Sequence, residues 1–390
     1  MNKDFFEKGV VEIIDGKSLQ SKLSSGKKLR VKLGVDPTRP DIHIGHAVLL
    51  RKLKELQKEG HKIIFLIGDY TTKIGDPSGR NKTRPILSDD EIAKNAKTYL
   101  DQVGKILDVK KTEIRYNSEW YSTLSFSDTL KITSLFTVAQ IIERDDFEKR
   151  LKAGSDIGIQ EILYPIMQAY DSVILKADIE FGGTDQKFNM LAGRSLQKKM
   201  GQTPQDIMMT KLLVGLDGKE KMSKSLDNYV GITESPNFQF GKIMSIPDSA
   251  IIEYFTLCTD LSAKEIGKYE ADLKTGVNPR DVKEKLALEI VKMYHSEKEA
   301  EKAKQEFKNV FTKKELPSSI PEIKISGNYD LPLFLIEIGA ASSNSEAKRL
   351  IEQGGVKIDG AKITDPKSDI ATHKGMIVQV GKKKAYKIKQ

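Results

Sequence analysis

The sequence has very little cysteine, and this scarcity excludes several kinds of site. Cys258 is the only cysteine among 390 residues. An intramolecular disulfide, a cysteine-rich zinc site and a paired-thiol redox centre each need at least two thiols, so none of them can form within this chain. The composition favours a reducing compartment, and we expect the cytoplasm.

Long apolar runs are also missing. No run approaches the roughly 20 apolar residues that span a bilayer, and the amino terminus mixes charged and apolar side chains where a secretion signal would have an apolar core. Hydrophobic residues make up 38% of the chain and charged residues 31%, which is typical of globular domains. We therefore expect no membrane association and two or three domains, each with its own core.

Charge is abundant and unevenly distributed. The formal net charge is +9, and residues 331–390 hold 11 Lys and Arg against 6 Asp and Glu, a net +5 of that total. A basic balance favours an anionic partner. The carboxyl-terminal region is the more probable surface for a polyanion.

Apolar runs and amphipathic stretches alternate in the first half, which predicts an α/β domain with a Rossmann-like parallel sheet. Residues 29–36 and 62–68 are predicted strands around a helix at 45–59, and residues 172–183 are predicted to form a strand that enters a glycine turn. The predicted domains are an α/β domain at 1–228 with a helical insertion at about 115–170, an α-helical domain at 229–315 containing helices at 281–294 and 296–311, a linker at 316–330 rich in Pro, Ser and Gly, and a small α+β domain at 331–390.

The first predicted strand leads into a histidine turn, His43-Ile-Gly-His46, that opens the helix. Gly45 allows close backbone approach, the helix start offers free N–H groups, and the two imidazoles can bind phosphate oxygens. This arrangement suits a triphosphate. Zinc is the competing use of paired histidines, but no cysteine or carboxylate motif lies nearby. Neither Gly-x-Gly-x-x-Gly nor a Walker Gly-Lys-Ser/Thr sequence occurs at this strand, which argues against dinucleotide and P-loop enzymes.

A second candidate phosphate-binding segment is Lys221-Met-Ser-Lys224-Ser225. Its lysines and small hydroxyl side chains stand in a loop bounded by Gly218, which could close over phosphates. By itself the segment could equally be a solvated charge cluster. A third segment, Gly68 to Arg80, follows the second predicted strand and is basic at its end.

Three polar side chains share one face of a predicted helix, because Tyr164, Gln168 and Asp171 are spaced four and three residues apart. A phenol, an amide and a carboxylate therefore converge. Spacing alone leaves open whether this face binds a ligand or is simply exposed to solvent, and Pro165 would weaken a helix interior.

Taken together, these segments resemble the tyrosyl-tRNA synthetases, which are class I aminoacyl-tRNA synthetases. The resemblance rests on the histidine turn, residues 221–225, Asp36-Pro-Thr38, residues 74–80, the Tyr164–Gln168–Asp171 face and Gly182-Gly-Thr-Asp185-Gln186, which occur in the family's order along nearly the whole chain. It implies that the enzyme joins tyrosine and ATP into tyrosyl-adenylate with release of pyrophosphate, and then acylates tRNA(Tyr).

The residue roles that the resemblance implies fall into three groups. Tyrosine would bind to Asp76, Tyr164 and Gln168 through its amino group, to Asp171 through its phenol, and near Gln186 through its carboxylate. ATP would lie against Gly34, Asp36, Gly45, Gly182, Gly183, Asp185, Met222, Ser223 and Ser225, with Asp185 and the Gly182–Gly183 turn at the ribose. The leaving pyrophosphate would be stabilised by Thr38, His43, His46, Arg80, Arg84, Lys221 and Lys224, with Mg²⁺ accompanying ATP.

One position departs from the better-known bacterial members. They have a tyrosine where Lys32 stands, and that tyrosine shares the substrate phenol with the aspartate. Lys32 could donate to the phenol oxygen or pair with Asp171, and its presence is typical of a second bacterial branch of the family.

The carboxyl-terminal region predicts an amphipathic helix, a second helix opening at residues 343–346, and a β pattern at residues 356–363. Lys348, Arg349 and Lys357 on this unit resemble the RNA-binding surface of a domain shared with a small-subunit ribosomal protein. The resemblance implies that this domain binds tRNA, mainly through phosphate neutralisation. It also implies a homodimer joined through the insertion at 115–170.

Three alternatives share some of these features. Small nucleotidyltransferases share the histidine turn and sheet, but the appended domains argue against them. Tyr164, Gln168 and Asp171 argue against the tryptophan-specific relatives. The intact motifs argue against a non-catalytic RNA-binding paralogue.

Overall fold

The computed structural model describes residues 3–78, 87–312, 322–381 and 384–389. The chain divides into two compact units, Met1–Glu301 and Lys302–Gln390. The division falls inside a helix and not at residue 228 or 316, so the predicted domain limits remain predictions. Within the described ranges, no helix has both the length and the apolar content needed to cross a membrane.

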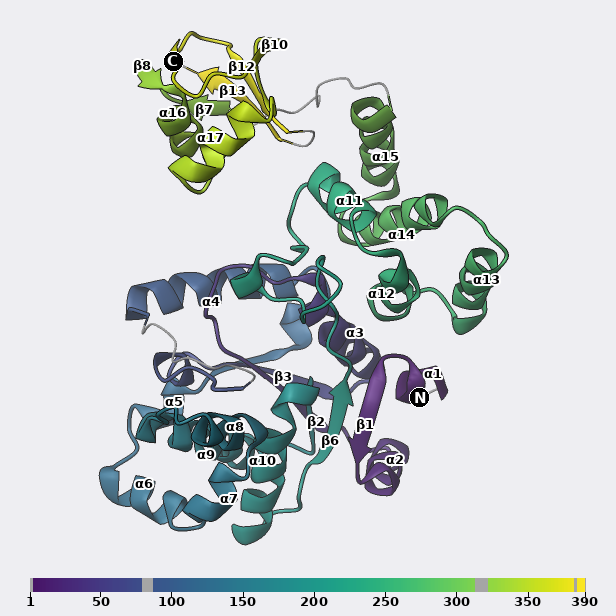
Figure 1. Cartoon of the computed structure of the whole chain (residues 1–390). Coiled ribbons are helices and arrows are strands. Elements are labelled where there is room, and N and C mark those ends of the chain that lie inside the picture. Colours follow the sequence, from purple (N-terminus) through teal and green to yellow (C-terminus); the bar gives the residue numbers. More distant parts are fainter. Residues whose placement is uncertain (1–2, 79–86, 313–321, 382–383, 390) are drawn as a thin grey trace. The chain divides into compact units, whose positions relative to one another are not determined.

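A six-stranded sheet lies at the centre of the first unit (Figure 1). Its strands, in spatial order, are β1 (Val10–Ile14), β6 (Asp206–Thr210), β5 (Ile179–Gly183), β2 (Arg30–Val35), β3 (Lys62–Ile67) and β4 (Glu113–Tyr116). All neighbours are parallel except β1 and β6, which are antiparallel. The chain moves outward from β2 through β3 to β4 on one side, and from β5 to β6 on the other. The strand order therefore reverses between β2 and β5, and such a reversal leaves a crevice at the carboxyl ends of the two strands.

The first βαβ unit confirms the prediction from sequence. Strands β2 and β3 are mostly buried, as expected of parallel strands covered on both faces. Helix α3 (Ile44–Lys58) connects them, begins directly after His43, and is followed by Gly60 in a left-handed conformation with φ of 88°. Glycine adopts that conformation without steric cost, which is why the helix ends there.

Helices surround this sheet. They are α1 (Lys3–Glu7), α2 (Gly16–Ser24), α3, α4 (Asp89–Val103) and α10 (Lys187–Lys199), together with α5 (Ser118–Tyr121), α6 (Phe126–Thr133), α7 (Val138–Ile142), α8 (Asp145–Lys152) and α9 (Ile159–Ile174) between β4 and β5. The predicted helical insertion therefore corresponds to α5–α9. Figure 1 shows α9 and α10 side by side, and α9 continues through the buried Pro165 without ending.

The strand predicted from residue 172 is wrong over its first part. Residues up to Ile174 belong to α9, and β5 begins at Ile179 after Lys176, which has a positive φ of 47°. Val173 and Leu175 are buried by helix packing, and a short apolar run cannot by itself distinguish a buried helix end from a strand. The glycine turn is also displaced, because both Gly182 and Gly183 lie within β5.

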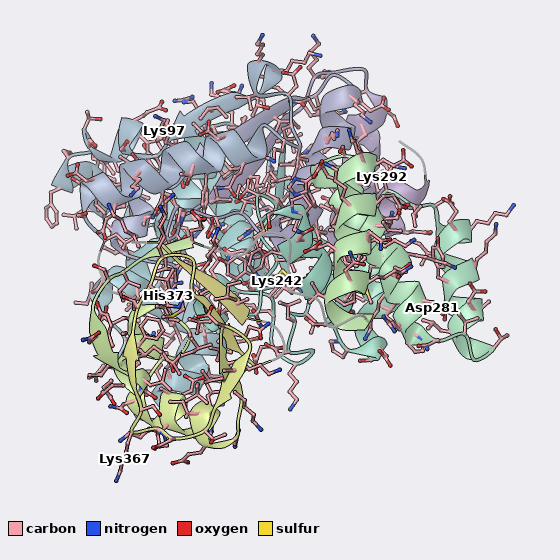
Figure 2. The ribbon with its side chains drawn as sticks, turned by 90° about the horizontal axis from the view of Figure 1, so that it is seen from above. Lys97, Lys242, Asp281, Lys292, Lys367 and His373 are labelled. Atoms are coloured by element: carbon pink, nitrogen blue, oxygen red, sulfur yellow. The ribbon has the colours of Figure 1, made fainter. Side chains whose placement is uncertain are left out.

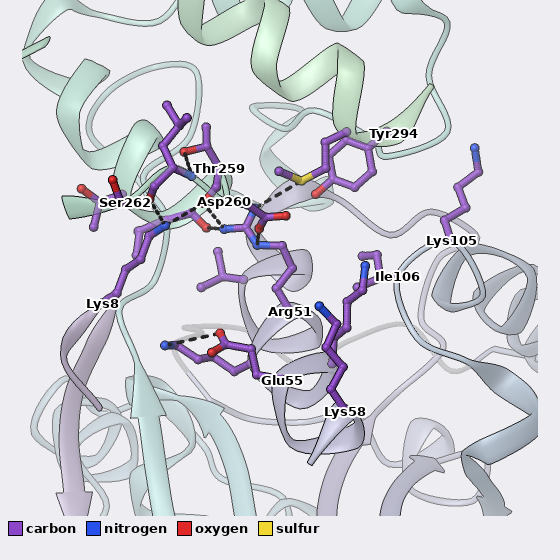
Figure 3. Close-up of a pocket in the computed structure, with 17 residues that line it drawn as sticks. Lys8, Arg51, Glu55, Lys58, Lys105, Ile106, Thr259, Asp260, Ser262 and Tyr294 are labelled. Carbon is purple, nitrogen blue, oxygen red and sulfur yellow. Dashed lines mark hydrogen bonds and ion pairs between the residues drawn. The ribbon is translucent and has the colours of Figure 1, made fainter. Parts of the chain in front are cut away.

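Five helices follow the α/β part: α11 (Pro236–Met244), α12 (Ile251–Cys258), α13 (Ala263–Lys274), α14 (Pro279–Tyr294) and α15 (Glu297–Thr312). The last two confirm the predicted helices at 281–294 and 296–311. Figure 3 shows how this region is attached. Lys8 donates to the carbonyl oxygens of Thr259 and Leu261, and Arg51 donates to those of Leu257 and Thr259. The last carbonyls of a helix lack intrahelical partners, so Arg51 completes the end of α12 through Leu257. Lys8 holds the segment that follows this helix.

The second unit has an α+β fold, as predicted. A five-stranded sheet has the order β10 (Ala361–Ile363), β9 (Val356–Ile358), β12 (Ile377–Val380), β13 (Lys384–Lys389) and β7 (Glu322–Lys324), and β11 (Asp369–Ala371) pairs with β8 (Asn328–Asp330). Helices α16 (Leu331–Glu337) and α17 (Asn344–Glu352) pack in its core. Charged groups such as Lys367 and His373 lie on its surface (Figure 2).

The predicted linker at 316–330 is wrong for its second part. Residues 313–321 lie outside the described ranges, but β7 and β8 occupy much of 322–330. Strand β7 pairs in parallel with β13, and Ile323 packs against the core of the second unit. This pairing joins residues 65 apart, such as Glu322 and Lys387, and the local Ser and Gly content does not reveal it.

Candidate active site

A cavity of about 690 Å³ opens at the carboxyl ends of β2 and β5, where the strand order reverses. It brings together most of the predicted site residues: Gly34, Asp36, Thr38, His43, Gly45, His46, Asp76, Tyr164, Gln168, Asp171, Gly182, Asp185, Gln186, Lys221, Met222, Ser223 and Lys224. Arg80, Arg84 and the side chain of Ser225 lie outside what the structure describes. The two signatures, which are about 175 residues apart in sequence, therefore line one cavity.

The histidine turn is built as a reciprocal cap on α3. The backbone N–H of His46 donates to Nδ1 of His43, and the backbone N–H of His43 donates to Nδ1 of His46, each over 3.3 Å. The two rings stack with their centroids 3.6 Å apart. Because Nδ1 accepts in both rings, a neutral ring carries its proton on Nε2. Both imidazoles can therefore donate from Nε2.

The histidines are neutral at physiological pH. Burial, together with the nearby charges of Lys224 and Lys221, lowers the pKa of His46 to about 3. Burial also lowers the pKa of His43 well below its usual value, with smaller contributions from His46 and Lys224. These imidazoles would therefore act on an anion as neutral hydrogen-bond donors.

Both lysines of the 221–225 segment are held by protein groups. The Lys221 Nζ lies 2.7 Å from Oδ2 of Asp185. The Lys224 Nζ donates to the Tyr99 hydroxyl over 2.6 Å and to the Arg39 carbonyl over 3.1 Å. These bonds hold both ammonium groups at the cavity. Asp185 lies at the cavity as predicted, but its partner in this structure is Lys221.

Asp36 anchors the end of β2 within the cavity. Its two carboxylate oxygens accept hydrogen bonds from the Thr71 and Tyr164 hydroxyls, each over 2.9 Å. The Tyr164 hydroxyl therefore points its proton at Asp36.

Asp76 is held as an ionised acceptor. Oδ1 accepts from both the backbone and the hydroxyl of Ser78, Oδ2 accepts from Gln186 over 2.8 Å, and Arg144 lies 3.6 Å away. Burial acts to raise the pKa of Asp76, but Arg144 and the bonds from Ser78 and Gln186 outweigh it and keep that pKa below its ordinary value. A fixed negative charge at this position suits an ammonium group.

Asp171 occupies a deeper and drier position. Its carboxylate accepts from Nε1 of Trp120 over 3.0 Å and from Nδ2 of Asn117 over 3.4 Å. Burial raises its pKa to about 6, against the opposing effects of Lys32, Tyr121, Trp120 and Asn117. At neutral pH this is a buried carboxylate whose four lone-pair sites are not all used.

Lys32 does not pair with Asp171, which corrects one of the two roles considered for it. Its ammonium lies 2.9 Å from Oε1 of Glu180, with both side chains buried. It also donates to the Ser172 hydroxyl over 2.7 Å and to the Gln168 carbonyl over 3.1 Å. Lys32 and Glu180 face each other across the β2–β5 pairing.

Different local contacts explain why glycine stands at each of these positions in the site. A Cβ on Gly45 would come within 3.0 Å of Nδ1 of His43, so a side chain there would crowd the histidine cap. A Cβ on Gly182 would meet Sδ of Met190 at 2.9 Å, and one on Gly183 would meet Leu212 at 2.6 Å. Gly183 does not line the cavity, so its predicted contact with ATP is not supported by its position.

Charges of both signs line the cavity. Asp36, Asp76 and Asp171 are among its lining residues, and so are the histidine turn, Lys221 and Lys224. Carboxylates complement the ammonium of an amino acid, and the donors complement a polyphosphate. Among the described residues, no group of three or more His, Cys, Asp or Glu side chains is arranged to hold a metal ion.

Several site residues were missed from the sequence: Asn117, Trp120, Arg144 and Glu180. Glu180 had a recognisable signal, since it is the one charge in the apolar strand β5, just as Lys32 stands among apolar neighbours in β2. A lone charge in a buried strand needs a partner. Trp120 and Arg144 had no comparable signal, because their partners come from distant segments.

The predicted RNA-binding residues lie in the second unit. Lys348 and Arg349 are on α17 and Lys357 is on β9, and all three side chains are exposed. Their positive charges are therefore exposed to solvent.

Comparisons with known proteins agree with this architecture. Residues 24–312 match the family model of class I tRNA synthetases (W and Y), and residues 331–380 match the S4 domain. The chain is 50% identical to a tyrosine–tRNA ligase of Thermotoga maritima and 52% identical to tyrosine–tRNA ligase 2 of Clostridium acetobutylicum, in each case over 98% of this chain and 96% of the relative.

Solved structures support the fold. A tyrosyl-tRNA synthetase from Archaeoglobus fulgidus, complexed with L-tyrosine, superposes with a TM-score of 0.62 at 23% identity, over 77% of this chain and 98% of that one. A tryptophanyl-tRNA synthetase from Plasmodium falciparum gives 0.61 at 15% identity, over 77% and 84%. The fold alone therefore does not separate the two specificities. The family model covers both as well, and it shows that the chain belongs to the class I tRNA synthetases. The near-full-length relatives separate the two specificities, and they place the chain in the family of the tyrosine–tRNA ligases.

Proposed function

We propose that this protein activates L-tyrosine with ATP to form tyrosyl-adenylate, and then transfers the tyrosyl group to the 3′ end of tRNA(Tyr). The observation that supports this most directly is the single cavity that places Asp171, the ammonium-binding acceptors and both phosphate-binding segments together. The relatives that match almost the whole chain carry the name tyrosine–tRNA ligase.

Tyrosine fits the carboxylates and amides that line the cavity. Its phenol would donate to Asp171, and its ammonium would lie against Asp76, Gln168 and Tyr164. Gln186, which is held by Asp76, would lie near the carboxylate. Phenylalanine would leave Asp171 without the phenolic donor, and an unmet buried carboxylate is costly.

ATP fits the histidine turn and the 221–225 segment. Gly182 and Asp185 would adjoin the ribose, and Met222 and Ser223 would adjoin the nucleotide. The donors proposed for the leaving pyrophosphate are Thr38, His43, His46, Lys221 and Lys224, with Arg80 and Arg84 as further candidates outside the described residues. We propose that Mg²⁺ enters as part of the MgATP substrate, with the phosphates as its ligands.

The first step needs no nucleophile from the protein. The tyrosine carboxylate oxygen forms a bond to the α-phosphorus, and the bond from that phosphorus to the bridging oxygen of pyrophosphate breaks. Negative charge grows on the leaving pyrophosphate, where the Nε2–H groups of His43 and His46 and the ammonium groups of Lys221 and Lys224 can stabilise it. In the second step a ribose hydroxyl of the tRNA terminus attacks the acyl carbon and AMP leaves.

The insertion between β4 and β5 supports a homodimer. Its surface exposes large apolar side chains, including Phe126 at 77% and Ile159 at 76%. Apolar groups gathered on one segment favour burial against another chain. We expect Phe126→Asp to shift the protein to monomers in analytical ultracentrifugation. The control Phe238→Asp makes the same substitution at an exposed phenylalanine of α11, and it should leave the dimer unchanged. A wild type that sediments as a monomer would contradict the dimer.

The second unit would bind tRNA through Lys348, Arg349 and Lys357, mainly by phosphate neutralisation. The cytoplasm is the proposed compartment, since the single cysteine is buried and reduced.

Amino-acid-dependent exchange of labelled pyrophosphate into ATP tests the first step. We expect exchange with tyrosine, a far smaller kcat/KM with phenylalanine, and none above background with tryptophan. Exchange that depends on tryptophan would replace the proposed substrate, and exchange with none of the three would refute activation altogether.

A further inference from the structure

A buried ion pair lies on the wall of the cavity, and the residue roles proposed above give it no task. Lys32 on β2 and Glu180 on β5 face each other in the strand register and are 0% and 2% exposed to solvent. Both line the cavity beside Gln168. Burying two charges is costly, and an apolar pair of similar volume often serves stability as well or better. A functional reason for the pair is therefore worth seeking.

All three ammonium protons of Lys32 are donated to protein groups. An ammonium has three protons, and those of Lys32 go to Oε1 of Glu180, the Ser172 hydroxyl and the Gln168 carbonyl. Donation to a substrate phenol would break one of these bonds. Lys32 is thus anchored to helix α9 and to β5, and it is not available to the phenol.

The glutamate fixes the orientation of an amide. Glu180 accepts from Lys32, from the Ser172 hydroxyl over 3.1 Å, from Gln205, and from Nε2 of Gln168 over 3.3 Å. A carboxylate can only accept, so the NH₂ of Gln168 must face it.

The opposite end of the amide, Oε1, is its acceptor. Oε1 of Gln168 accepts from Nδ2 of Asn189 over 2.9 Å and keeps a second lone pair. Without Glu180 the amide could turn over and present its NH₂ to the ligand. That orientation would repel an ammonium and leave it without an acceptor.

We propose that Lys32 and Glu180 form a positioning pair for the α-ammonium of the amino-acid substrate, in which Glu180 orients Gln168 as an acceptor and Lys32 holds Glu180 and the α9 backbone in place. This inference rests on the proposed function, since it takes Gln168 as a ligand of the tyrosine amino group. It assigns the pair to the amino end of the substrate and leaves selection of the phenol to Asp171.

Glu180→Gln tests the assignment. The variant loses one acceptor oxygen and leaves Lys32 as an unpaired cation near the ammonium. We expect the affinity for L-tyrosine and for tyramine, measured by titration calorimetry on the full chain, to fall about tenfold or more. The affinity for 3-(4-hydroxyphenyl)propanoate, which has no amino group, should change less than about twofold on the same reasoning.

Two further variants separate positioning from folding. In Lys32→Met/Glu180→Gln the unpaired cation is gone and the new amide can still accept from Gln168, so tyrosine should bind more tightly than to Glu180→Gln. Glu161→Gln is the matched control. Like Glu180, Glu161 is a buried glutamate in an ion pair, but it lies on α9, pairs with Arg150 and does not line the cavity. It should lower stability without changing the ratio of the three affinities.

The kinetic outcome is equally specific. In pyrophosphate exchange, Glu180→Gln should raise KM for tyrosine more than it lowers kcat, and the ratio of kcat/KM for tyrosine over phenylalanine should stay at the wild-type value. Equal losses for tyrosine and 3-(4-hydroxyphenyl)propanoate, or a fall in that ratio, would overturn the inference while the active wild type still supports the proposed function. An inactive wild type that binds no tyrosine would overturn both.

Discussion

Asparagine in place of Asp171 should remove most of the preference for tyrosine over phenylalanine. The carboxylate is 3% exposed and accepts hydrogen bonds from Trp120 and Asn117. A hydrogen bond to a charged group contributes about 1.5–3 kcal/mol, which corresponds to about 10- to 150-fold in kcat/KM. We therefore expect the tyrosine-to-phenylalanine ratio in pyrophosphate exchange to fall by that factor.

The same group predicts a pH dependence. Because burial raises the pKa of Asp171 to about 6, kcat/KM for tyrosine should rise with pH through about 6 and then level off, since that parameter reports the free enzyme. Phenylalanine makes no bond to Asp171 and should show no such step, and the step should be absent from Asp171→Asn.

The raised pKa of Asp171 also affects the free energy of unfolding. Its contribution falls as pH rises, whereas that of a salt-bridged carboxylate grows. A carboxyl group whose pKa is higher in the folded state than the ordinary 3.8 destabilises the fold as pH rises from about 4 to about 6. A shift of about two units corresponds to about 3 kcal/mol at most. The stability of Asp171→Asn relative to the wild type should therefore improve from pH 4 to pH 7 in urea unfolding. A tyrosine step that persists in the variant, or an unchanged tyrosine-to-phenylalanine ratio, would refute this reasoning.

Three other predictions follow from the same structure. His46→Ala and Lys224→Ala should each slow adenylate formation about 100- to 1000-fold in single-turnover kinetics, with tyrosine affinity little changed, because they act on the leaving group; comparable losses in both would remove that role. Arg150→Met should lower the free energy of unfolding by about 3–5 kcal/mol in urea titrations, since it leaves Glu161 buried and unpaired, and an unchanged midpoint would show that the pair is solvated. Lys348→Ala should weaken tRNA binding and reduce the slope of log K against log salt by about 0.7–0.9; an unchanged slope would place the phosphate contacts elsewhere.

Much of the fold was accessible from local sequence patterns. The apolar runs of β2 and β3 and the amphipathic α3 follow from periodicity, and the histidine turn followed from its position at the start of that helix. The strand expected from residue 172 failed for a tertiary reason, since packing of α9 buries the same apolar residues that a strand would bury.

The site was predictable in its motifs and not in its pairings. Nothing near Lys32 indicates that Glu180 lies opposite it, because the register of β2 and β5 joins segments nearly 150 residues apart. Trp120 was passed over for the same reason, since its partner Asp171 is 51 residues away. Assignment to a second bacterial branch, the roles of Arg80 and Arg84, and the limits of the domains stay predictions.

The most direct test of the central claim is aminoacylation of tRNA by the full chain. Unfractionated bacterial tRNA would be incubated with ATP, Mg²⁺ and one labelled amino acid at a time, and acid-precipitable label would be counted. The account predicts that tyrosine is incorporated to the level of the tRNA(Tyr) fraction, and that tryptophan and phenylalanine are not incorporated. Incorporation of tryptophan, or no incorporation of tyrosine by enzyme that is folded and binds ATP, would contradict it.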